Sequence, residues 1–287
     1  MKNYLRSAAA VSIWMSALVF TSCNTSWSPA VETDASKYEL RGAVVSLRSV
    51  PYKVDSTEDG YRLGELDPLA NNIYVEFNED GNATLLRRYN RKGEVASVQT
   101  SKYDEAGRIQ ETELVSSSGD LLEKTVYTYR RGRMSTMTVT DGMDSLKKYE
   151  EYEYFAPDSV RVCYSFKVNR PAGHRLMLYD ERGLLTGNIM YSVNDKVISE
   201  FRMKYDESGR RDSIYSDNML FGKLSTKMEY DGNGFNSSLT MSGEARTTVL
   251  RFDYKLDAHG NWIEKTTWQD DGAIPVKVEK REIEYAG

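Results

Sequence analysis

Hydrophobic and polar residues alternate in short runs along most of the chain, and a turn sequence separates each run from the next. Before each turn, apolar residues recur at every second position with a charged or hydroxylic residue between them, as in Val75, Glu76 and Phe77. A period of two with one apolar and one polar face predicts a half-buried β-strand. The runs that follow the turns alternate well at 160–166 and poorly at 213–216 and 236–238. The pattern predicts an all-β chain built from hairpins.

One tight-turn sequence recurs at a nearly constant interval, and its clearest copy is the run YDEAGR at 103–108. The residues that precede the turns stand at positions 77, 103, 129, 154, 179, 205, 230 and 256, which are 25 or 26 residues apart. Asp at the first turn position accepts backbone N–H groups, and Gly at the fourth takes a positive φ, as in a type I turn followed by a left-handed glycine. The turn residues of the best copies are Asp104, Gly107, Asp180, Gly183, Asp206, Gly209, Asp231, Gly234, Asp257 and Gly260.

A weaker turn lies halfway through each unit, so each unit holds two strands of ordinary length. We therefore expect one antiparallel meander of about 16 to 18 strands, built from these 25–26-residue YD-like hairpin repeats. Twisted strands in this number seldom stay flat, so the sheet should curl into a half-shell or barrel-like form with its tyrosine-rich face inside. The first strand should alternate at Ala43, Val45 and Leu47, and residues 55–69 should form a long loop.

The polar face of the strands argues against a membrane-spanning barrel. Lipid would have to contact either Lys, Glu and Arg or a tyrosine-rich face that is not confined to two girdles. Composition does not shift between residues 37 and 287, which predicts a single β-repeat domain there.

Residues 1–22 have the features of a targeting segment. Lys2 and Arg6 precede an apolar run at 8–20 that is too short to span a membrane. The run ends in FTSC at 20–23, which resembles a bacterial lipobox and implies lipidation of Cys23; the alternative is a plain secretory signal with an incidental cysteine. Residues 23–36 are small and polar and read as a flexible tether. By the same resemblance, Asn24 in place of Asp, and the lack of an acidic cluster nearby, favour the outer membrane and its periplasmic face.

Composition narrows the classes of partner. The net charge is −5, and removal of residues 1–22 with their two basic residues leaves −7. An acidic chain without basic stripes is not expected to bind nucleic acid, because that affinity depends on Lys and Arg. The 20 tyrosines suit a curved sheet with a thin core. The chain has two cysteines, and lipidation of Cys23 would leave Cys163 without a partner for a disulfide. We interpret Cys163 as an inert thiol.

No pattern of catalytic or metal-binding residues emerges from the sequence. His174 and His259 lie in different repeats without partners at ligand spacing, and the turn aspartates lack the alternating oxygen donors that calcium requires. There is no phosphate-binding loop and no GxSxG elbow. We therefore expect no enzyme, no metal and no cofactor. Trp262 and Trp268 should share one face of a strand, either as an exposed sugar-stacking platform or as a buried plug of the last repeat, which we favour.

The repeated tyrosine–aspartate turn followed by glycine resembles the YD repeat of RHS-type proteins over residues 72–285, with departures at 130–132, 155–157 and Leu256. The resemblance implies a β-strip wound into a hollow shell around a cargo, although nothing matches the cargo, the self-cleaving core or a toxin tip. Our functional expectation is a non-enzymatic, lipid-anchored envelope protein that binds or scaffolds a glycan, a peptide or another envelope protein. The alternative is a miniature shell that shields a partner polypeptide.

Overall fold

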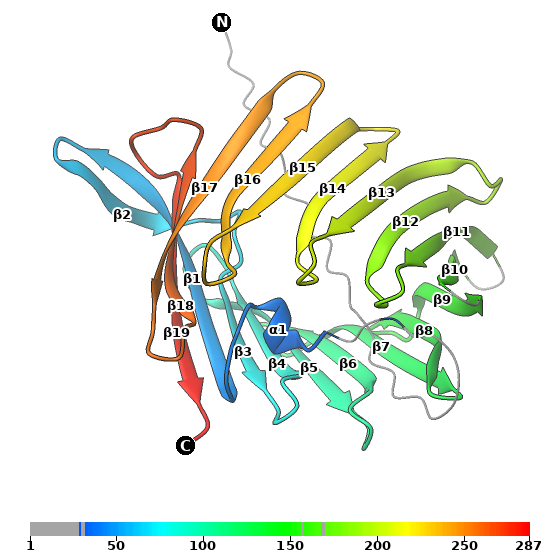
Figure 1. Ribbon diagram of the computed structural model, residues 1–287. Helices are drawn as coiled ribbons and strands as arrows, with labels where there is room; N and C mark the ends of the chain where they lie inside the picture. Colours follow the sequence, from blue (N-terminus) through cyan, green and yellow to red (C-terminus); the bar gives the residue numbers. More distant parts are fainter. Residues whose placement is uncertain (1–28, 30–31, 156–157, 168–169) are drawn as a thin grey trace, which may run out of the picture.

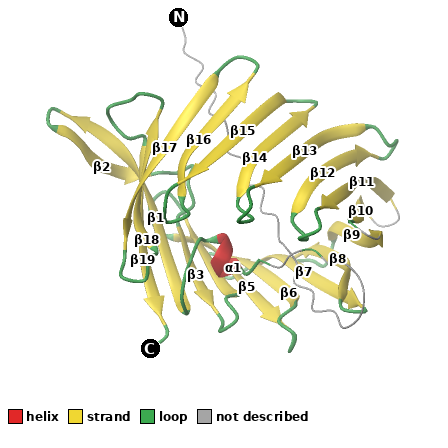
Figure 2. Cartoon of the chain, in the orientation of Figure 1, coloured by secondary structure: helices red, strands yellow, loops and turns green. Residues whose placement is uncertain are grey.

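A computed structural model describes residue 29 and residues 32–155, 158–167 and 170–287. The predicted signal peptide at 1–22 and the lipidation site at Cys23 lie outside these residues. In the described part of the chain, no helix is both long and apolar enough to cross a membrane. The described residues form strands and one helical turn. Figure 2 draws the strands in yellow and the helical turn in red.

The strands follow one another along the chain after the helical turn α1 (Asp34–Lys37). Their bounds are β1 (Val44–Thr57), β2 (Gly60–Leu66), β3 (Ile73–Phe77), β4 (Ala83–Tyr89), β5 (Val95–Tyr103), β6 (Ile109–Ser116), β7 (Leu121–Arg130), β8 (Arg133–Asp141), β9 (Leu146–Phe155), β10 (Ser159–Lys167), β11 (Arg170–Tyr179), β12 (Leu185–Ser192), β13 (Val197–Tyr205), β14 (Arg211–Asn218), β15 (Gly222–Tyr230), β16 (Asn236–Gly243), β17 (Thr247–Leu256), β18 (Trp262–Gln269) and β19 (Lys277–Tyr285). The poorly alternating runs at 213–216 and 236–238 thus form strands.

The sheet closes into a barrel (Figure 1). From β3 to β19 every strand pairs antiparallel with its neighbours in sequence, and β1 pairs with both β3 and β19. Ser46 of β1 lies opposite Glu76 of β3 and opposite Glu284 of β19, so this strand joins the two ends of the meander. Among the described residues the ring therefore has 18 strands, with β2 as a branch. The all-β antiparallel meander is confirmed. Of the two forms expected for the sheet, the barrel-like one agrees with the structure and the half-shell is wrong, because β1 leaves neither end of the meander as a free edge.

The first hairpin also differs from the sequence prediction. Residues 55–69 are not a long loop, because β1 continues to Thr57 and pairs with β2, with Thr57 opposite Gly60. This hairpin is mostly exposed, so it carries no apolar alternation that would have identified it. At the start of β1, Val44 and Leu47 are buried and Val45 is 42% exposed. The register of β1 shifts between Val44 and Ser46, which breaks the alternation expected there.

The repeated turns have the chemistry that their sequence predicts. In the turn after β5, the N–H of Asp104 donates to the carbonyl of Arg108 at 2.9 Å, and Gly107 donates to the carbonyl of Asp104 at 2.9 Å. Asp104 Oδ1 also accepts the N–H groups of Ala106 and Arg108. The fourth residue has a φ of 72° to 85° in Gly107, Gly183, Gly209, Gly234 and Gly260. Each of these turns is a hairpin connection with a left-handed glycine, followed by a shift in strand register.

Side chains link each repeat to the next. The hydroxyl of Tyr205 donates to the carbonyl of Leu185, twenty residues earlier, at 2.7 Å, and Tyr129 bonds Ile109 in the same way. The guanidinium of Arg108 pairs with its own turn aspartate and lies 4.9 Å from the centre of the Tyr129 ring, in the next repeat. The tyrosines at 103, 129, 205 and 230, which precede four of the turns, therefore each link a repeat to the one before it.

The folded domain begins earlier than expected. Thr33 caps α1 by accepting the N–H of Ser36, and Ala35 donates its N–H to the carbonyl of Gly81 at 2.9 Å. Ala35, Tyr38 and Leu40 pack against a buried cluster from β1, β3 and β4. Residues 34–36 were predicted to belong to a flexible tether, and this is corrected: they form a helical turn inside the ring of strands (Figure 1).

Candidate functional site

The two faces of the barrel wall differ in chemistry. Because directly opposed residues share a face, rows of side chains can be followed around the ring. The row that contains Leu47, Val75 and Leu86 faces inward, since it packs beneath α1. Inward side chains of the other strands are mostly aromatic or aliphatic, with a few charges. They include Tyr103, Tyr127, Tyr152, Val162, Tyr164, Met177, Met203, Phe252 and Tyr254.

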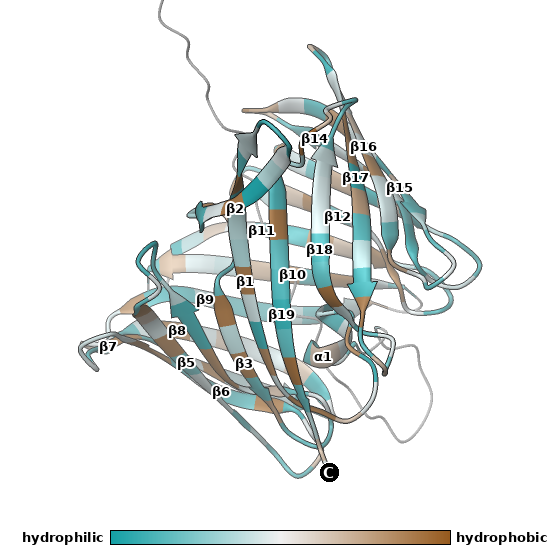
Figure 3. Ribbon diagram, turned by 90° about the vertical axis from the view of Figure 1, so that its left-hand side faces the viewer, coloured by the Kyte–Doolittle hydropathy of each residue, from teal (hydrophilic) through white to brown (hydrophobic). Residues whose placement is uncertain are grey.

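Charged side chains cover the outer face. Glu111 lies between Lys102 and Lys124, each 2.8 Å away, and hydrogen bonds from these lysines lower the pKa of Glu111 to about 2. Elsewhere on the outer wall, Glu264 pairs with Lys255 at 2.6 Å. Figure 3 shows polar and apolar residues mixed along the strands rather than gathered in a belt. The described outer wall lacks the apolar band that a membrane-spanning barrel turns toward lipid.

The inner wall is accessible to solvent. A ring of 16 to 18 strands is too wide for its own side chains to fill, whereas a ring of about eight is not. In agreement, inward side chains such as those of Met177 and Phe252 are only partly buried. Arg175, which also faces inward, keeps 27% of its side-chain surface exposed. The barrel therefore presents an aromatic inner surface that a ligand can contact.

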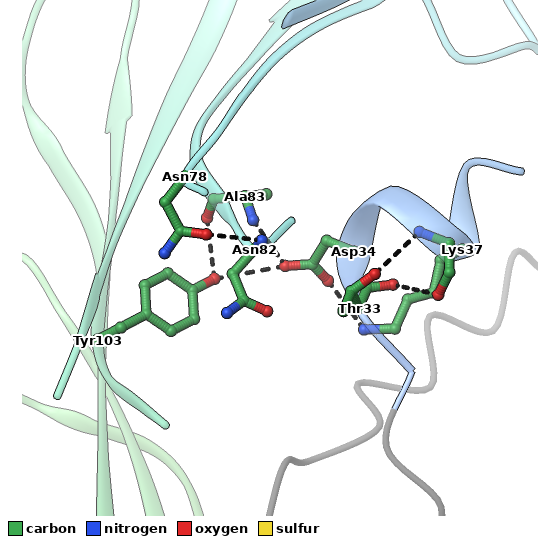
Figure 4. Close-up of polar contacts among 8 residues, drawn as sticks. Thr33, Asp34, Lys37, Asn78, Asn82, Ala83 and Tyr103 are labelled. Atoms are coloured by element: carbon green, nitrogen blue, oxygen red, sulfur yellow. Dashed lines mark hydrogen bonds and ion pairs between the residues drawn. The ribbon is translucent and has the colours of Figure 1, made fainter. Parts of the chain in front are cut away.

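A segment at residues 33–41, which we call the inner segment, lies against part of this surface. Asp34 accepts the N–H of Ala83 at 2.9 Å and the hydroxyl of Tyr103 at 3.3 Å, so it points into the sheet from α1 (Figure 4). At its other end, the backbone N–H of Arg41 donates to Asn261 Oδ1 at 2.7 Å. The guanidinium of Arg41 lies 4.8 Å from the centre of the Phe235 ring. These contacts extend from β5 through β1 and β19 to the turn before β16.

The first charged cluster on the inner wall surrounds Glu150 of β9. Its carboxylate accepts from the hydroxyl of Tyr152 at 2.6 Å and from Arg175 at 3.1 Å, and it pairs with Lys148 at 2.7 Å. The Glu150 side chain is 3% exposed. Burial by itself would raise the pKa of this carboxyl, but Arg175 and Lys148 outweigh it, so the pKa of Glu150 lies below its ordinary value.

The second charged cluster surrounds Lys265 of β18. Its ammonium lies 4.4, 5.5 and 5.8 Å from the ring centres of Phe252, Tyr254 and Trp262. Burial lowers the pKa of Lys265 below its ordinary value, although Glu39 and the neighbouring Glu279 act in the opposite direction. Three aromatic faces thus stabilise the ammonium in place of hydrogen-bond acceptors.

The two tryptophans do not form the platform considered from the sequence. Trp262 is 2% exposed and faces inward, where it donates to Glu39 at 2.9 Å and lies beneath the guanidinium of Arg281. Trp268 faces outward and donates to Asp253. The expectation that both indoles share a face is wrong. Lys255 pairs with Glu264 and Leu256 pairs with Trp262, so β18 has one extra residue, Ile263, at this point. The extra residue reverses which face the later side chains of β18 occupy, and Trp268 therefore faces outward. Trp262 fits the predicted plug of the last repeat.

The remaining candidates from the sequence lie apart from one another. Cys163 is a free, partly buried thiol whose pKa is raised by burial. The ring of His174 stacks on Tyr191, and that of His259 stacks on Tyr285. No group of His, Cys, Asp and Glu among the described residues is arranged to hold a metal ion.

Sequence reasoning missed Glu150 and Lys265. Both are charged residues at inward positions: Glu150 precedes the inward Tyr152 on β9, and Lys265 lies between the inward Trp262 and Thr267 on β18. A break in the alternation is the signal that could have identified Glu150, between Lys148 and Tyr152. Lys265 gives no such signal, since the register shift near Trp262 hides which face it occupies.

Comparison with known proteins gives likenesses among solved structures alone. No protein-family model matches the chain, and no curated protein matches it. A porin-like protein from Bacteroides uniformis is similar at 10% identity over 84% of this chain and 96% of its own, with a TM-score of 0.47. A porin-like protein from Bacteroides vulgatus is similar at 12% identity over 66% of this chain and 94% of its own, with a TM-score of 0.34.

Proposed function

We propose that this chain is a non-enzymatic barrel protein of the bacterial cell envelope that binds a ligand against its inner wall. The observation that carries the proposal is the division of the barrel surface: charged side chains face outward, and partly exposed aromatic side chains line a ring of 18 strands. Such a ring leaves room inside for more than its own side chains. Aromatic surface with a few polar groups is typical of ligand sites.

The location in the envelope rests on the sequence. The targeting segment and the lipobox-like sequence before Cys23 support export and a lipid anchor, with the periplasmic face of the outer membrane favoured by Asn24. A charged outer wall suits a barrel that stands in an aqueous compartment beside the membrane. Candidate ligands are a glycan, a peptide or a segment of another envelope protein.

A second candidate is a miniature shell that shields a partner polypeptide, as the YD-repeat resemblance implies. One observation favours it: a polypeptide, the chain's own inner segment, already lies against the inner wall through backbone and side-chain contacts. A partner chain would then lie against the inner wall in a similar way.

The test compares bulky substitutions on the two faces of one strand. Met177→Trp narrows the interior, whereas Leu176→Trp, one residue earlier on β11, adds the same bulk outside. Each variant is purified from its native envelope in mild detergent, and bound molecules are identified by native mass spectrometry. We expect a bound molecule in the wild type and in Leu176→Trp and its loss in Met177→Trp. A bound polypeptide would favour the shell; an empty wild-type barrel, or equal retention by both variants, would refute interior binding.

A further inference from the structure

Lys265 is an inward cation of the barrel for which the described residues provide no hydrogen-bond acceptor. Among the described residues its ammonium makes three contacts with aromatic rings and neither an ion pair nor a hydrogen bond. An ammonium has three N–H donors, and cation–π contacts satisfy its charge but not those donors. Lys265 is partly rather than fully buried as a residue.

A second side chain without a hydrogen-bond partner among the described residues, that of Thr267, lies near Lys265. Thr267 lies two residues further along β18 on the same inward face, opposite Phe252. Its side chain is buried, with the residue 5% exposed, and its hydroxyl has no hydrogen-bond partner among the described residues. Buried hydroxyls are nearly always hydrogen-bonded, so one without a partner calls for an explanation. An ammonium and a hydroxyl on one face, both lacking acceptors, define a place for an oxygen-rich group.

The surrounding charges determine which group fits. Lys277, Glu279 and Arg281 of β19 and Glu39 of the inner segment face Lys265, together with the phenol of Tyr254. Arg281 already donates to the carbonyl of Tyr38 at 2.8 Å. With Lys265 included, three cations and two carboxylates leave one positive charge.

The acceptors already present are engaged elsewhere. Glu279 accepts the hydroxyl of Ser49 at 2.7 Å and lies 3.6 Å from Lys277, and Glu39 accepts the indole N–H of Trp262. A single residual positive charge matches a carboxylate, which is a monoanion. A phosphate monoester carries about −1.5 to −2 charges at pH 7 and would be repelled by the two glutamates.

We propose that Lys265 and Thr267 bind the carboxylate of a small organic acid whose apolar body rests on the rings of Phe252 and Tyr254. Phe252 is partly exposed toward the interior, so it offers an aromatic face to such a body. This inference rests on the proposed function, since it places the ligand against the inner wall, and it names the chemical class. The carboxylate completes the hydrogen bonds that the ammonium and the hydroxyl lack, and these bonds are charge-assisted.

The test uses 3-phenylpropionate as the probe and its neutral analogue 3-phenylpropan-1-ol, titrated into the purified chain by isothermal calorimetry. We expect the acid to bind and the alcohol to bind at least roughly tenfold more weakly, because a hydrogen bond to a charged group is lost. Lys265→Met, which keeps most of the length of the side chain without its charge, should lower affinity for the acid by roughly tenfold or more. The matched control is Lys255→Met on the outer wall of the adjacent strand, which should bind like the wild type.

Thr267→Val provides a second variant that keeps the shape of the side chain. Its hydroxyl has no partner to lose, so the fold should persist, and affinity for the acid should fall by about threefold to tenfold. No binding of 3-phenylpropionate at millimolar concentration, or binding by Lys265→Met equal to that of the wild type, would overturn the proposal. A molecule retained from the envelope despite either result would show that interior binding stands and that Lys265 is not its anchor.

Discussion

Gly232 and Gly234 occupy one turn between β15 and β16, and they should respond in opposite directions to the same substitution. Gly234 has a φ of 85°, where a side chain costs about 1–2 kcal/mol in backbone strain. A Cβ at Gly234 would come no closer than 3.9 Å to its nearest neighbours, the guanidinium groups of Arg210 and Arg41, so packing adds nothing to that cost. Gly232 lacks the positive φ and has open space around it. Alanine there should stabilise the fold by about 0.4–1 kcal/mol, because the unfolded chain loses freedom.

Urea unfolding followed by circular dichroism measures both variants. We expect Gly234→Ala to be less stable than Gly232→Ala by about 1.5–3 kcal/mol in free energy of unfolding, with unchanged dependence on urea concentration. Gly234→Asn should recover part of the loss, since Asn tolerates the left-handed region. Gly209→Ala repeats the test in a turn where the nearest side-chain atom is Leu184 Cδ1 at 3.7 Å and Arg41 plays no part. Equal stability of the two alanine variants would refute the assignment of strain to the fourth turn position.

Three further predictions concern the links between repeats, the inner segment and the buried charge. Tyr205→Phe removes the hydroxyl that bonds the carbonyl of Leu185 and should lower the free energy of unfolding by about 0.5–1.5 kcal/mol in urea titrations; no change would contradict the link. Asp34→Ala leaves the N–H of Ala83 without its acceptor and should increase hydrogen exchange at that amide, whereas protection equal to the wild type would refute the contact. The pKa of Glu150 in the folded state lies below its ordinary value of 4.5. The ionised carboxylate therefore stabilises the fold fully above pH 4.5, and this stabilisation is lost as the pH falls through the lowered pKa. Glu150→Gln should therefore show a smaller loss of stability on acidification below pH 4.5 than the wild type, measured by thermal unfolding across pH.

The hairpins could be predicted from the sequence because their information is local. The interval between turns fixes where each strand begins, and Asp104 and Gly107 show which turn type forms. Closure of the ring is not local: it depends on β1 pairing with β19, and nothing in the alternation of Val44 and Leu47 identifies that distant partner. The sequence pattern predicted that the sheet curls, but it did not predict that the two ends of the meander join through β1.

The candidate site was harder to predict, for two physical reasons. A register shift after the turn places Trp262 and Trp268 on opposite faces, although their spacing in sequence puts them on one. The same shift hides the inward direction of Lys265. In addition, the residues at 34–36 are small and polar, as in a tether. Their position in the fold depends on hydrogen bonds with Gly81 and Ala83, which lie far from them in the sequence. Composition alone does not reveal such contacts.

The pairing of β1 with β19 has a consequence for assembly of the fold. Ser46 donates to Glu284, a contact between residues 238 positions apart, so the seam forms only after nearly the whole meander is available. Contacts of such long range slow folding, because the entropy of closing the loop is lost before the pairing is gained. Until then both terminal strands of the meander expose unpaired N–H and C=O groups to other chains. Newly made molecules should therefore be most prone to association with other chains during that interval.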